Sequence, residues 1–216
     1  TRTRTLNDVA DELVALYYSQ RASAGLIITE GLPVSEEGRG YLYTPGLYNE
    51  AQMHGWRKVT DAVHAKGGRI FAQLWHVGRM SHVSVLPENQ APVSSGTIPA
   101  TNTTVFAYSD SGEPSAVTPS IPRALETEEV KRVTKDFVKS ARLAIEAGFD
   151  GVEIHGAHGY IICQFLSSDI NKRIDEFGGS LENRARVLMR IVDGVREQCR
   201  PNMQLAVRLS PERFGM

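Results

Sequence analysis

Residues 150–160 have the sequence DGVEIHGAHGY, a short apolar run that ends in two histidines and a tyrosine. The β-branched residues of the run predict a buried strand. Polar, titratable side chains where a strand stops are typical of α/β barrels, whose catalytic groups collect at the carboxyl ends of the strands. Two imidazoles aimed at one point can hold a developing negative charge, and a neighbouring phenol can donate a proton. The stretch therefore predicts a parallel α/β fold and a carbonyl-activating site at His155, His158 and Tyr160.

Strand and helix signals alternate on both sides of this stretch. Apolar runs at 25–31, 69–76 and 203–210 predict three further strands. Helical periodicity predicts helices over 8–23, 49–66 and 127–148, and a fourth helix after Ser180. Strands that are apolar throughout and alternate with helices predict a parallel sheet covered by helices.

The ends and faces of these helices can be predicted in more detail. Short polar residues cap helices by accepting a hydrogen bond from a free N–H group. Asn7 or Asp8 is placed to cap the first helix, and Thr127 and Ser180 are placed to cap the last two. In the first helix one face is apolar, and we expect it to be buried: Val9, Leu13, Leu16 and Tyr17.

The connection over 78–123 interrupts the alternation. It shows no helical period and contains six prolines: Pro87, Pro92, Pro99, Pro114, Pro119 and Pro122. A connection longer than about 15 residues within a compact domain is usually functional or disordered. Because it follows the strand that carries Gln73 and Trp75, we expect it to form a wall or lid over the site. A surface insertion without a role is the alternative.

Composition limits the classes of function. The 216 residues are 41% hydrophobic and 23% charged, which is typical of one globular unit with a single core. A formal net charge of −1 favours neither nucleic acid nor an anionic membrane, and no apolar run approaches the roughly 20 residues of a membrane helix. Cys163 and Cys199 match no zinc or redox spacing and fit a reducing compartment. We therefore expect a cytoplasmic protein that acts on a small molecule, with no nucleic-acid or membrane partner.

Two more predicted strands carry polar side chains near their ends. Gln73 and Trp75 are two residues apart and therefore share one side of their strand. An amide in that position can bind the edge of a ring through paired hydrogen bonds. Arg208 ends the last strand in the same way, and a buried guanidinium requires an anion or an electron-rich ring nitrogen beside it. The structural alternative for Arg208 is an ion pair with a neighbouring carboxylate such as Glu153.

The two histidines are also candidate metal ligands. A catalytic zinc site needs a third protein ligand, and the other acidic side chains near predicted strand ends are Glu30 and Glu153. A metal-dependent barrel hydrolase is therefore an alternative, although we expect no metal site. Schiff-base chemistry requires a buried lysine, and every lysine falls on a predicted helix or loop.

Several motifs along the chain together resemble the Old Yellow Enzyme family. They are QRASAGLIITEG at 20–31, QLWHVGR at 73–79, IHGAHGY at 154–160, QFLS at 164–167 and NKRIDEFGGSLENR at 171–184. The histidine pair and the loop over 81–94 are most similar to the bacterial pentaerythritol tetranitrate and N-ethylmaleimide reductases. The resemblance covers essentially the whole chain.

This resemblance implies an FMN-dependent ene-reductase on a (β/α)8 TIM barrel. In that family NADPH or NADH reduces the flavin, and an α,β-unsaturated carbonyl or nitro compound, or a nitrate ester, then takes the place of the coenzyme. By resemblance, His155 and His158 polarise the substrate oxygen, flavin hydride goes to the β-carbon, and Tyr160 protonates the α-carbon. Trp75 and Tyr41 would line the substrate pocket. Hydride attack builds enolate charge on that oxygen, which two fixed N–H donors stabilise most at the transition state.

The resemblance also assigns four residues to the flavin. Thr1 would contact the flavin carbonyl near the reactive ring nitrogen, and Gly31 would offer a main-chain contact. Gln73 would bind the pyrimidine edge, and Arg208 would stabilise the negative charge of the reduced ring.

By the same resemblance, residues 1–216 form one incomplete FMN-binding barrel domain. It runs from the end of strand 1, at Thr1, to strand 5, at Arg208. Strands 6–8 would be absent, and with them the loops that bind the flavin phosphate. A parallel half-barrel has two bare edges, so we expect a longer protein or a second chain to complete it. Alone, the chain should bind FMN weakly; a non-catalytic fragment or scaffold is the alternative.

Overall fold

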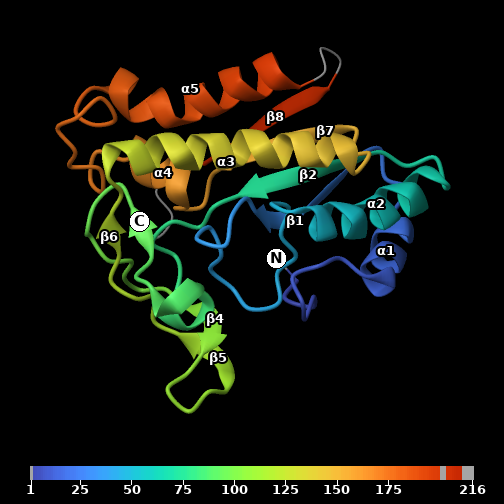
Figure 1. The fold of residues 1–216 in the computed structure, drawn as a ribbon, viewed down its shortest axis with the longest axis horizontal. Helices are drawn as coiled ribbons and strands as arrows, with labels where there is room; N and C mark the ends of the chain where they lie inside the picture. Colours follow the sequence, from blue (N-terminus) through green and yellow to red (C-terminus); the bar gives the residue numbers. More distant parts are fainter. Residues whose placement is uncertain (1, 200–202, 211–216) are drawn as a thin grey trace.

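The computed structural model describes residues 2–199 and 203–210. Within this part of the chain, the main sheet has four parallel strands in the order β1-β2-β7-β8 (Figure 1). They are β1 (Ile27–Pro33), β2 (Ile70–Trp75), β7 (Gly151–Gly156) and β8 (Gln204–Leu209). Each strand coincides with a predicted one, and the parallel pairing confirms the α/β class.

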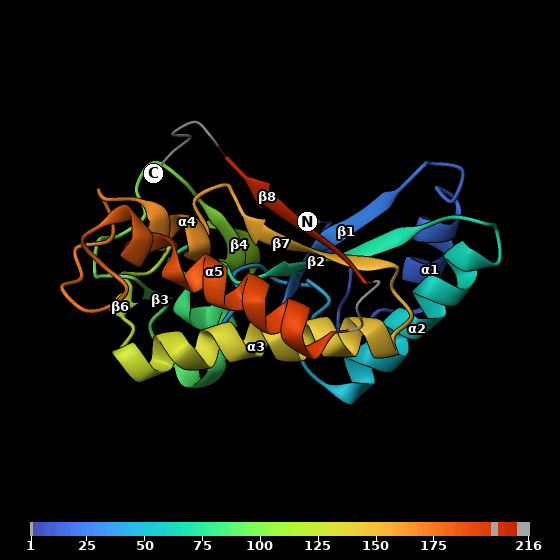
Figure 2. The ribbon, with the colours of Figure 1, turned by 90° about the horizontal axis from the view of Figure 1, so that it is seen from above.

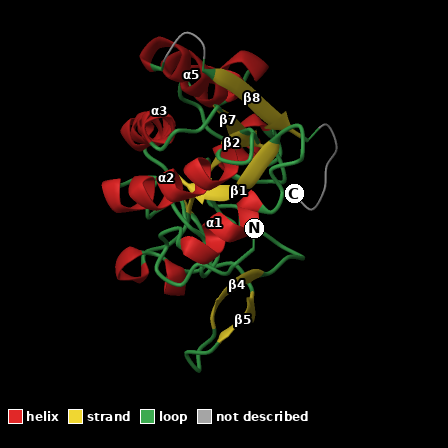
Figure 3. Ribbon diagram, turned by 90° about the vertical axis from the view of Figure 1, so that its right-hand side faces the viewer, coloured by secondary structure: helices red, strands yellow, loops and turns green. Residues whose placement is uncertain are grey.

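Helices cover one face of this sheet (Figure 3). They are α2 (Glu50–His64), α3 (Thr127–Glu146) and α5 (Leu181–Gln198), while α1 (Glu12–Ser19) packs against α2. Figure 2 shows α3 and α5 side by side along the sheet. Their buried faces and the strands share one core, with Trp56, Phe137 and Ile154 fully enclosed. This core holds the strands rigidly, so the positions of their carboxyl ends are well defined.

The arrangement agrees with part of a (β/α)8 barrel. Each parallel connection crosses over through a helix, as the geometry of parallel strands requires. Closure into a barrel, and the division into one domain over 1–216, remain predictions. Among residues 2–199 and 203–210, no helix combines the length and the apolar character that a membrane span requires.

The first helix begins later than predicted. Its cap is Asp11, whose carboxylate accepts a hydrogen bond from the Val14 N–H at 3.0 Å, and not Asn7 or Asp8. Asp8 has a φ of 55°, which lies in the left-handed region and cannot lead directly into a right-handed helix. The chain therefore turns once more before α1 starts.

The buried face of α1 also differs from the prediction. Leu13 and Leu16 are 68% and 51% exposed, and the buried positions are instead Val14, Ala15, Tyr18 and Ser19. The Tyr18 hydroxyl lies 3.3 Å from a carboxylate oxygen of Glu30 on β1 and accepts the Glu30 N–H at 3.0 Å. This polar contact fixes the rotation of the helix, which apolar periodicity alone could not indicate.

The caps of the two long C-terminal helices are close to those predicted. Ser180 caps α5 by accepting a hydrogen bond from the Asn183 N–H at 3.3 Å, as predicted. The cap of α3 is Glu126, one residue before the predicted Thr127. Glu126 and Glu129 form a reciprocal capping box, which satisfies two free N–H groups at once.

The connection over 78–123 has a small structure of its own. It contains the 3₁₀ turns η1 (Val83–Val85) and η2 (Pro87–Asn89), and the strands β3 (Val93–Ser94), β4 (Val105–Tyr108), β5 (Pro114–Val117) and β6 (Arg123–Ala124). Strands β4 and β5 form a hairpin that extends away from the main sheet (Figure 1). Leu42, from the loop after β1, packs with side chains of this connection in a second apolar cluster. The absence of a long helix was predicted, but strands this short leave no period in the sequence.

Candidate active site

A cavity of about 260 Å³ opens where the carboxyl ends of β1, β2, β7 and β8 meet. It is lined by Thr29, Glu30, Gly31, Gln73, Trp75, His155, His158, Tyr160 and Arg208. Seven of these nine residues are predicted site residues; only Thr29 and Glu30 are not. The cavity therefore gathers side chains from four strands that lie far apart in the sequence.

Two predicted site residues are not in this lining. Tyr41, on the loop after β1, lies behind the lining: its hydroxyl is 3.4 Å from that of Tyr160, and its ring stacks on Trp75 with centroids 5.6 Å apart. Thr1 lies outside the described residues. Tyr41 is thus next to the cavity, in contact with two of its walls.

An irregularity in β1 brings Thr29 and Glu30 to the cavity. The register of β1 against β2 shifts between Ile28 and Gly31, so this strand bulges near its middle. The Thr29 hydroxyl accepts a hydrogen bond from the Gln73 N–H at 2.9 Å and takes the place of a main-chain partner. Bulges redirect side chains and are frequent next to active sites. Strict alternation along the strand could not reveal these two residues.

The rings of Trp75 and Tyr160 pack around His155. The Tyr160 ring meets those of Trp75 and His155 edge to face, with centroids 5.0 Å and 5.1 Å away. His155 and His158 are also edge to face, at 5.2 Å. His158 has a φ of 57°, a left-handed conformation that is uncommon outside glycine and that often marks a functional constraint. The glycines around it in the sequence allow this sharp turn after β7.

His155 is a neutral N–H donor. Its Nδ1 accepts the Ala157 N–H at 3.4 Å, which leaves the hydrogen of the neutral ring on Nε2. Burial, together with the nearby charges of His158 and Arg208, lowers the pKa of His155 to about 3. The imidazole is therefore uncharged at neutral pH and can donate a hydrogen bond without giving up a proton.

Tyr160 is held in its protonated form. Burial, followed by the neighbouring Tyr41 hydroxyl, raises the pKa of Tyr160 far above its ordinary value. Burial also raises the pKa of Tyr41. A phenol with so high a pKa releases its proton only to a strong base such as a carbanion.

The floor of the cavity carries an amide and a guanidinium. The Gln73 Nε2 donates to a carboxylate oxygen of Glu153 at 2.6 Å, so the buried Glu153 pairs with Gln73 and not with Arg208. Arg208 is exposed at the cavity and has no ion pair with any described residue. The structural alternative for Arg208, a salt bridge to Glu153, is therefore wrong, and the guanidinium is available to a ligand.

Gln164, on the short helix α4 (Ile161–Leu166), supports the site from behind. Its Nε2 donates to the carbonyl oxygens of Val77 (3.0 Å) and Gly159 (2.8 Å). Its Oε1 accepts the Arg79 N–H (3.1 Å) and the Ser94 hydroxyl (2.9 Å). One fully buried amide thereby joins the loop of the histidines to the start of the 78–123 connection. The sequence places Gln164 inside a recognised motif but gives no sign of this role.

The described residues of the cavity do not form a metal site. Within residues 2–199 and 203–210, no group of three or more His, Cys, Asp or Glu side chains is arranged to hold a metal ion. Glu30 contacts Tyr18 and Arg2, and Glu153 contacts Gln73. Neither carboxylate is therefore positioned as the third ligand that the hydrolase alternative requires.

Comparison with known proteins identifies the family. The model of the NADH:flavin oxidoreductase / NADH oxidase family matches residues 1–215. The chain belongs to this family. The description of this family names the enzyme class and the kinds of cofactor that the sequence predicts, a flavin and a nicotinamide coenzyme.

Individual members of the family agree with this placement. The chain is 45% identical over 212 residues to 12-oxophytodienoate reductase 1 of Oryza sativa subsp. japonica and 43% identical to 12-oxophytodienoate reductase 2 of Arabidopsis thaliana. Each alignment covers 98% of this chain but 53% and 55% of the relative. The chain thus spans about half the length of the curated relatives it matches.

Solved structures of the same family have the same fold. Morphinone reductase in complex with tetrahydroNAD matches with a TM-score of 0.95 and 46% identity, over 100% of this chain and 60% of that one. The Old Yellow Enzyme homologue from Zymomonas mobilis matches with a TM-score of 0.88 and 42% identity, over 97% and 56%. The predicted Old Yellow Enzyme family is confirmed. The finer resemblance to pentaerythritol tetranitrate and N-ethylmaleimide reductases remains a prediction.

The cavity of this flavin oxidoreductase chain fits a flavin ring chemically. Among the described residues, the buried Trp75 Nε1 has no hydrogen-bond partner and Arg208 makes no ion pair. The Gln73 side chain uses its NH₂ group for Glu153, which leaves its carbonyl oxygen as an acceptor. The N–H groups of Trp75 and Arg208 and the carbonyl oxygen of Gln73 could therefore form hydrogen bonds with the polar edge of an isoalloxazine ring.

Proposed function

We propose that this chain supplies the FMN- and substrate-facing part of an NAD(P)H-dependent ene-reductase. The observation that carries the proposal is the convergence of His155, His158 and Tyr160 with Gln73 and Arg208 around one cavity. A merely structural sheet needs none of these polar groups at its carboxyl edge. Membership of the flavin oxidoreductase family, and relatives named as reductases of 12-oxophytodienoate and morphinone, support the same reaction class.

Four residues are proposed to hold FMN. The Gln73 carbonyl oxygen would accept from the pyrimidine edge, and the main chain of Gly31 would contact the ring from β1. The Arg208 guanidinium would lie beside the ring nitrogen that becomes negative on reduction. Thr1, outside the described residues, completes the proposed set. When bound, FMN accepts hydride from NADPH or NADH and passes it to the β-carbon of an unsaturated carbonyl or nitro compound.

His155 and His158 are proposed to bind the substrate oxygen. His155 offers a neutral Nε2–H, and the ring of His158 stands 5.2 Å from it, close enough for both to reach one oxygen atom. Charge develops on that oxygen as hydride reaches the β-carbon. Fixed donors stabilise this charge more than they stabilise the neutral substrate, so they lower the barrier.

Tyr160 is proposed to complete the reaction by protonating the α-carbon. Its ring meets that of His155 with centroids 5.1 Å apart, and its raised pKa keeps the proton in place until a carbanion forms. The proton then moves from the Tyr160 oxygen to carbon, and solvent restores it. Trp75 and Tyr41 would form the apolar wall of the substrate pocket, with the 78–123 connection as a lid.

An absorption experiment tests the proposal. FMN is added to the purified protein, NADPH or NADH bleaches the flavin band without oxygen, and 2-cyclohexenone is then expected to restore it. In the variant carrying His155→Ala and His158→Ala we expect reoxidation by the enone to slow at least about 100-fold, the usual cost of lost oxyanion donors. Reoxidation by molecular oxygen needs no such donors and should persist. The control His54→Ala, at an exposed position of α2 outside the cavity, should behave as the wild type.

Two results would contradict the proposal. Absence of any flavin band in a protein that extends this chain to the full length of its curated relatives would favour the scaffold alternative. Equal rates of enone reoxidation in the wild type and the double variant would show that the histidines do not bind the substrate oxygen.

A further inference from the structure

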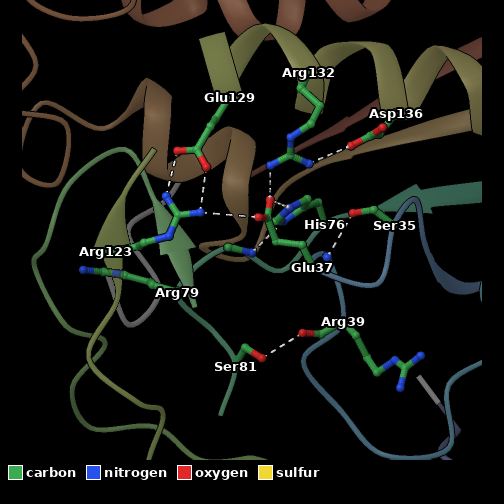
Figure 4. A network of polar contacts seen from close by, with 12 residues as sticks. Ser35, Glu37, Arg39, His76, Arg79, Ser81, Arg123, Glu129, Arg132 and Asp136 are labelled. Atoms are coloured by element: carbon green, nitrogen blue, oxygen red, sulfur yellow. Dashed lines mark hydrogen bonds and ion pairs between the residues drawn. The ribbon is translucent and has the colours of Figure 1, made fainter. Parts of the chain in front are cut away.

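A carboxylate outside the cavity connects four separate segments of the chain. Glu37, on the loop after β1, lies 2.8 Å from Arg132 on α3 and 3.7 Å from Arg123 on β6. The Oε1 atom of Glu37, which contacts Arg132, is also 3.8 Å from Nε2 of His76, the residue that follows β2 (Figure 4). Figure 4 shows Glu37 between these three side chains. The loop that carries Tyr41 is thus attached to the helix layer behind the sheet.

The contact with His76 is directional. The Nδ1 of His76 accepts the Gly78 N–H at 3.1 Å, so the neutral ring carries its hydrogen on Nε2, toward Glu37. His76 is fully buried, and this Nε2 has no hydrogen-bond partner among the described residues. Burial acts to raise the pKa of Glu37, but the nearby His76 ring and the Arg132 guanidinium outweigh it and lower the pKa to about 2. Glu37 is therefore charged under all ordinary conditions.

The arginines of this cluster do not depend on Glu37. Arg123 makes a second, two-pronged pair with Glu129, at 2.7 Å on both oxygens. Arg132 also pairs with Asp136, at 3.2 Å. Removal of the Glu37 charge would leave no cation without a carboxylate. The specific effect of Glu37 is to hold its own loop, rather than to neutralise the arginines.

The loop between Glu37 and Tyr41 is held against residues 77–81, so the position of Glu37 affects that of Tyr41 beside the cavity. The Gly38 carbonyl oxygen accepts the Val77 N–H at 3.1 Å, and the Arg39 carbonyl oxygen accepts the Ser81 hydroxyl at 2.7 Å. A Cβ at Gly40 would lie 2.4 Å from the Met80 carbonyl oxygen, so the two segments are in close contact. Tyr41 follows directly.

We infer that Glu37 is a positioning residue, which holds the 35–43 loop so that the Tyr41 ring covers Trp75 and its hydroxyl meets Tyr160. The ring stacking at 5.6 Å and the hydroxyl contact at 3.4 Å are the two contacts that this loop makes with the cavity wall. The positioning role of Glu37 is inferred from the contacts of the 35–43 loop alone. Its consequence for catalysis rests on the proposed function.

The first test needs no flavin and no activity. The chain has two tryptophans, Trp56 in the core at 0% exposure and Trp75 at 2%. In flavin-free Glu37→Gln, release of Tyr41 should open Trp75 and raise the acrylamide quenching constant by about twofold or more. The matched control Glu129→Gln removes a carboxylate from the same cluster but not from the loop, and should quench as the wild type does. Equal quenching in both variants would overturn the inference.

The second test measures the flavin-loaded protein. If Glu37 acts through Tyr41, Glu37→Gln should slow reoxidation by 2-cyclohexenone about tenfold, the usual scale for small misplacements of a pocket wall. The same substitution in a Tyr41→Phe background should then change the rate less than about twofold. Two substitutions that act through the same interaction are not additive, and the Tyr41 hydroxyl is already absent in this background. A tenfold effect that persists without the Tyr41 hydroxyl would overturn this route.

A second variant keeps the inference testable if Glu37→Gln fails to fold. Arg132→Gln breaks the same attachment from the helix side and should reproduce the quenching and rate effects of Glu37→Gln. If the flavin reaction is absent in every protein, the quenching comparison still decides the inference, while the proposed function alone fails. If Arg132→Gln and Glu37→Gln both leave quenching unchanged, the loop does not depend on this cluster.

Discussion

The main chain of Gly31 lies directly against the indole of Trp75. A Cβ at position 31 would stand 2.5 Å from Trp75 Cε3, closer than such atoms approach in real structures. Gly31 follows the bulge of β1, and Trp75 ends β2 beside it. The absence of a side chain at Gly31 therefore decides where the indole sits, and with it the shape of the proposed flavin cavity.

Gly31→Ala should displace the indole from this position. Overpacking of a dense site typically costs about 1–3 kcal/mol, so we expect the free energy of unfolding to fall by that amount. FMN affinity should fall by about tenfold or more, as the cavity wall shifts. The control is Gly25→Ala, since nothing lies within 4 Å of a Cβ there. Denaturant unfolding and FMN titration measure both effects, and equal behaviour of the two variants would contradict the role of Gly31.

Tyr160→Phe should separate the two halves of the proposed reaction. Loss of a general acid usually costs between about 100-fold and 10,000-fold, so reoxidation of the flavin by an enone should slow by that amount. Flavin reduction by NAD(P)H transfers no proton from Tyr160 and should stay nearly intact. Rapid-mixing absorbance measures each half separately. Equal loss in both halves would mean that Tyr160 is structural.

The pH dependence of stability should reveal His155. Its folded-state pKa is lowered to about 3, whereas an unfolded histidine titrates near 6.5. Between these values the unfolded chain binds a proton that the folded chain does not, so the contribution of His155 to stability is complete above pH 6.5 and falls as pH decreases. In that window one such group contributes a slope of about 1.4 kcal/mol per pH unit.

The measurement compares the wild type with His155→Gln. Denaturant unfolding at pH 4 to 7 should show a shallower loss of stability in the variant. Substrate binding should show no ionisation of His155 over the same range, because the neutral ring remains the donor. Parallel slopes in the two proteins would show that His155 titrates normally and that its burial does not control its charge.

The sequence was sufficient for the sheet but not for its irregularities. Short apolar runs located all four strands of the main sheet, because strands of a parallel sheet are rich in apolar residues. The same rule missed Thr29 and Glu30, since the bulge at Ile28–Gly31 breaks the alternation. Leu13 and Leu16 were predicted to be buried, but they are exposed. Apolar spacing indicates that a helix has an apolar face, but it does not show which polar contact fixes the rotation of the helix.

The residues of the candidate site that could be predicted are those whose side chains lie at or near the ends of predicted strands. His155, Gln73 and Arg208 could be placed together because the carboxyl ends of parallel strands share one edge. Gln164 and Glu37 were not found, because their partners are main-chain atoms and residues from distant segments. Such long-range polar contacts leave no period in the chain, and only the structure can supply them.

Gln164→Leu tests the amide that joins these segments. The side chain is fully buried, and its four hydrogen bonds reach Val77, Arg79, Ser94 and Gly159. Leucine has a similar volume but offers no polar atom, so all four partners would lose the amide. Leaving buried polar groups unpaired costs about 1–3 kcal/mol each when water cannot enter, and partial relaxation should limit the total loss of stability to about 2–4 kcal/mol.

Denaturant unfolding measures this loss, with Gln90→Leu as the control. Gln90 is exposed and uses no side-chain hydrogen bond within the described chain, so its substitution should change the free energy of unfolding by less than about 0.5 kcal/mol. Because Gly159 precedes Tyr160, Gln164→Leu should also slow enone reoxidation even at temperatures where the variant is folded. A variant as stable and as active as the Gln90 control would show that water replaces the amide, and that the loop after β7 holds its shape without it.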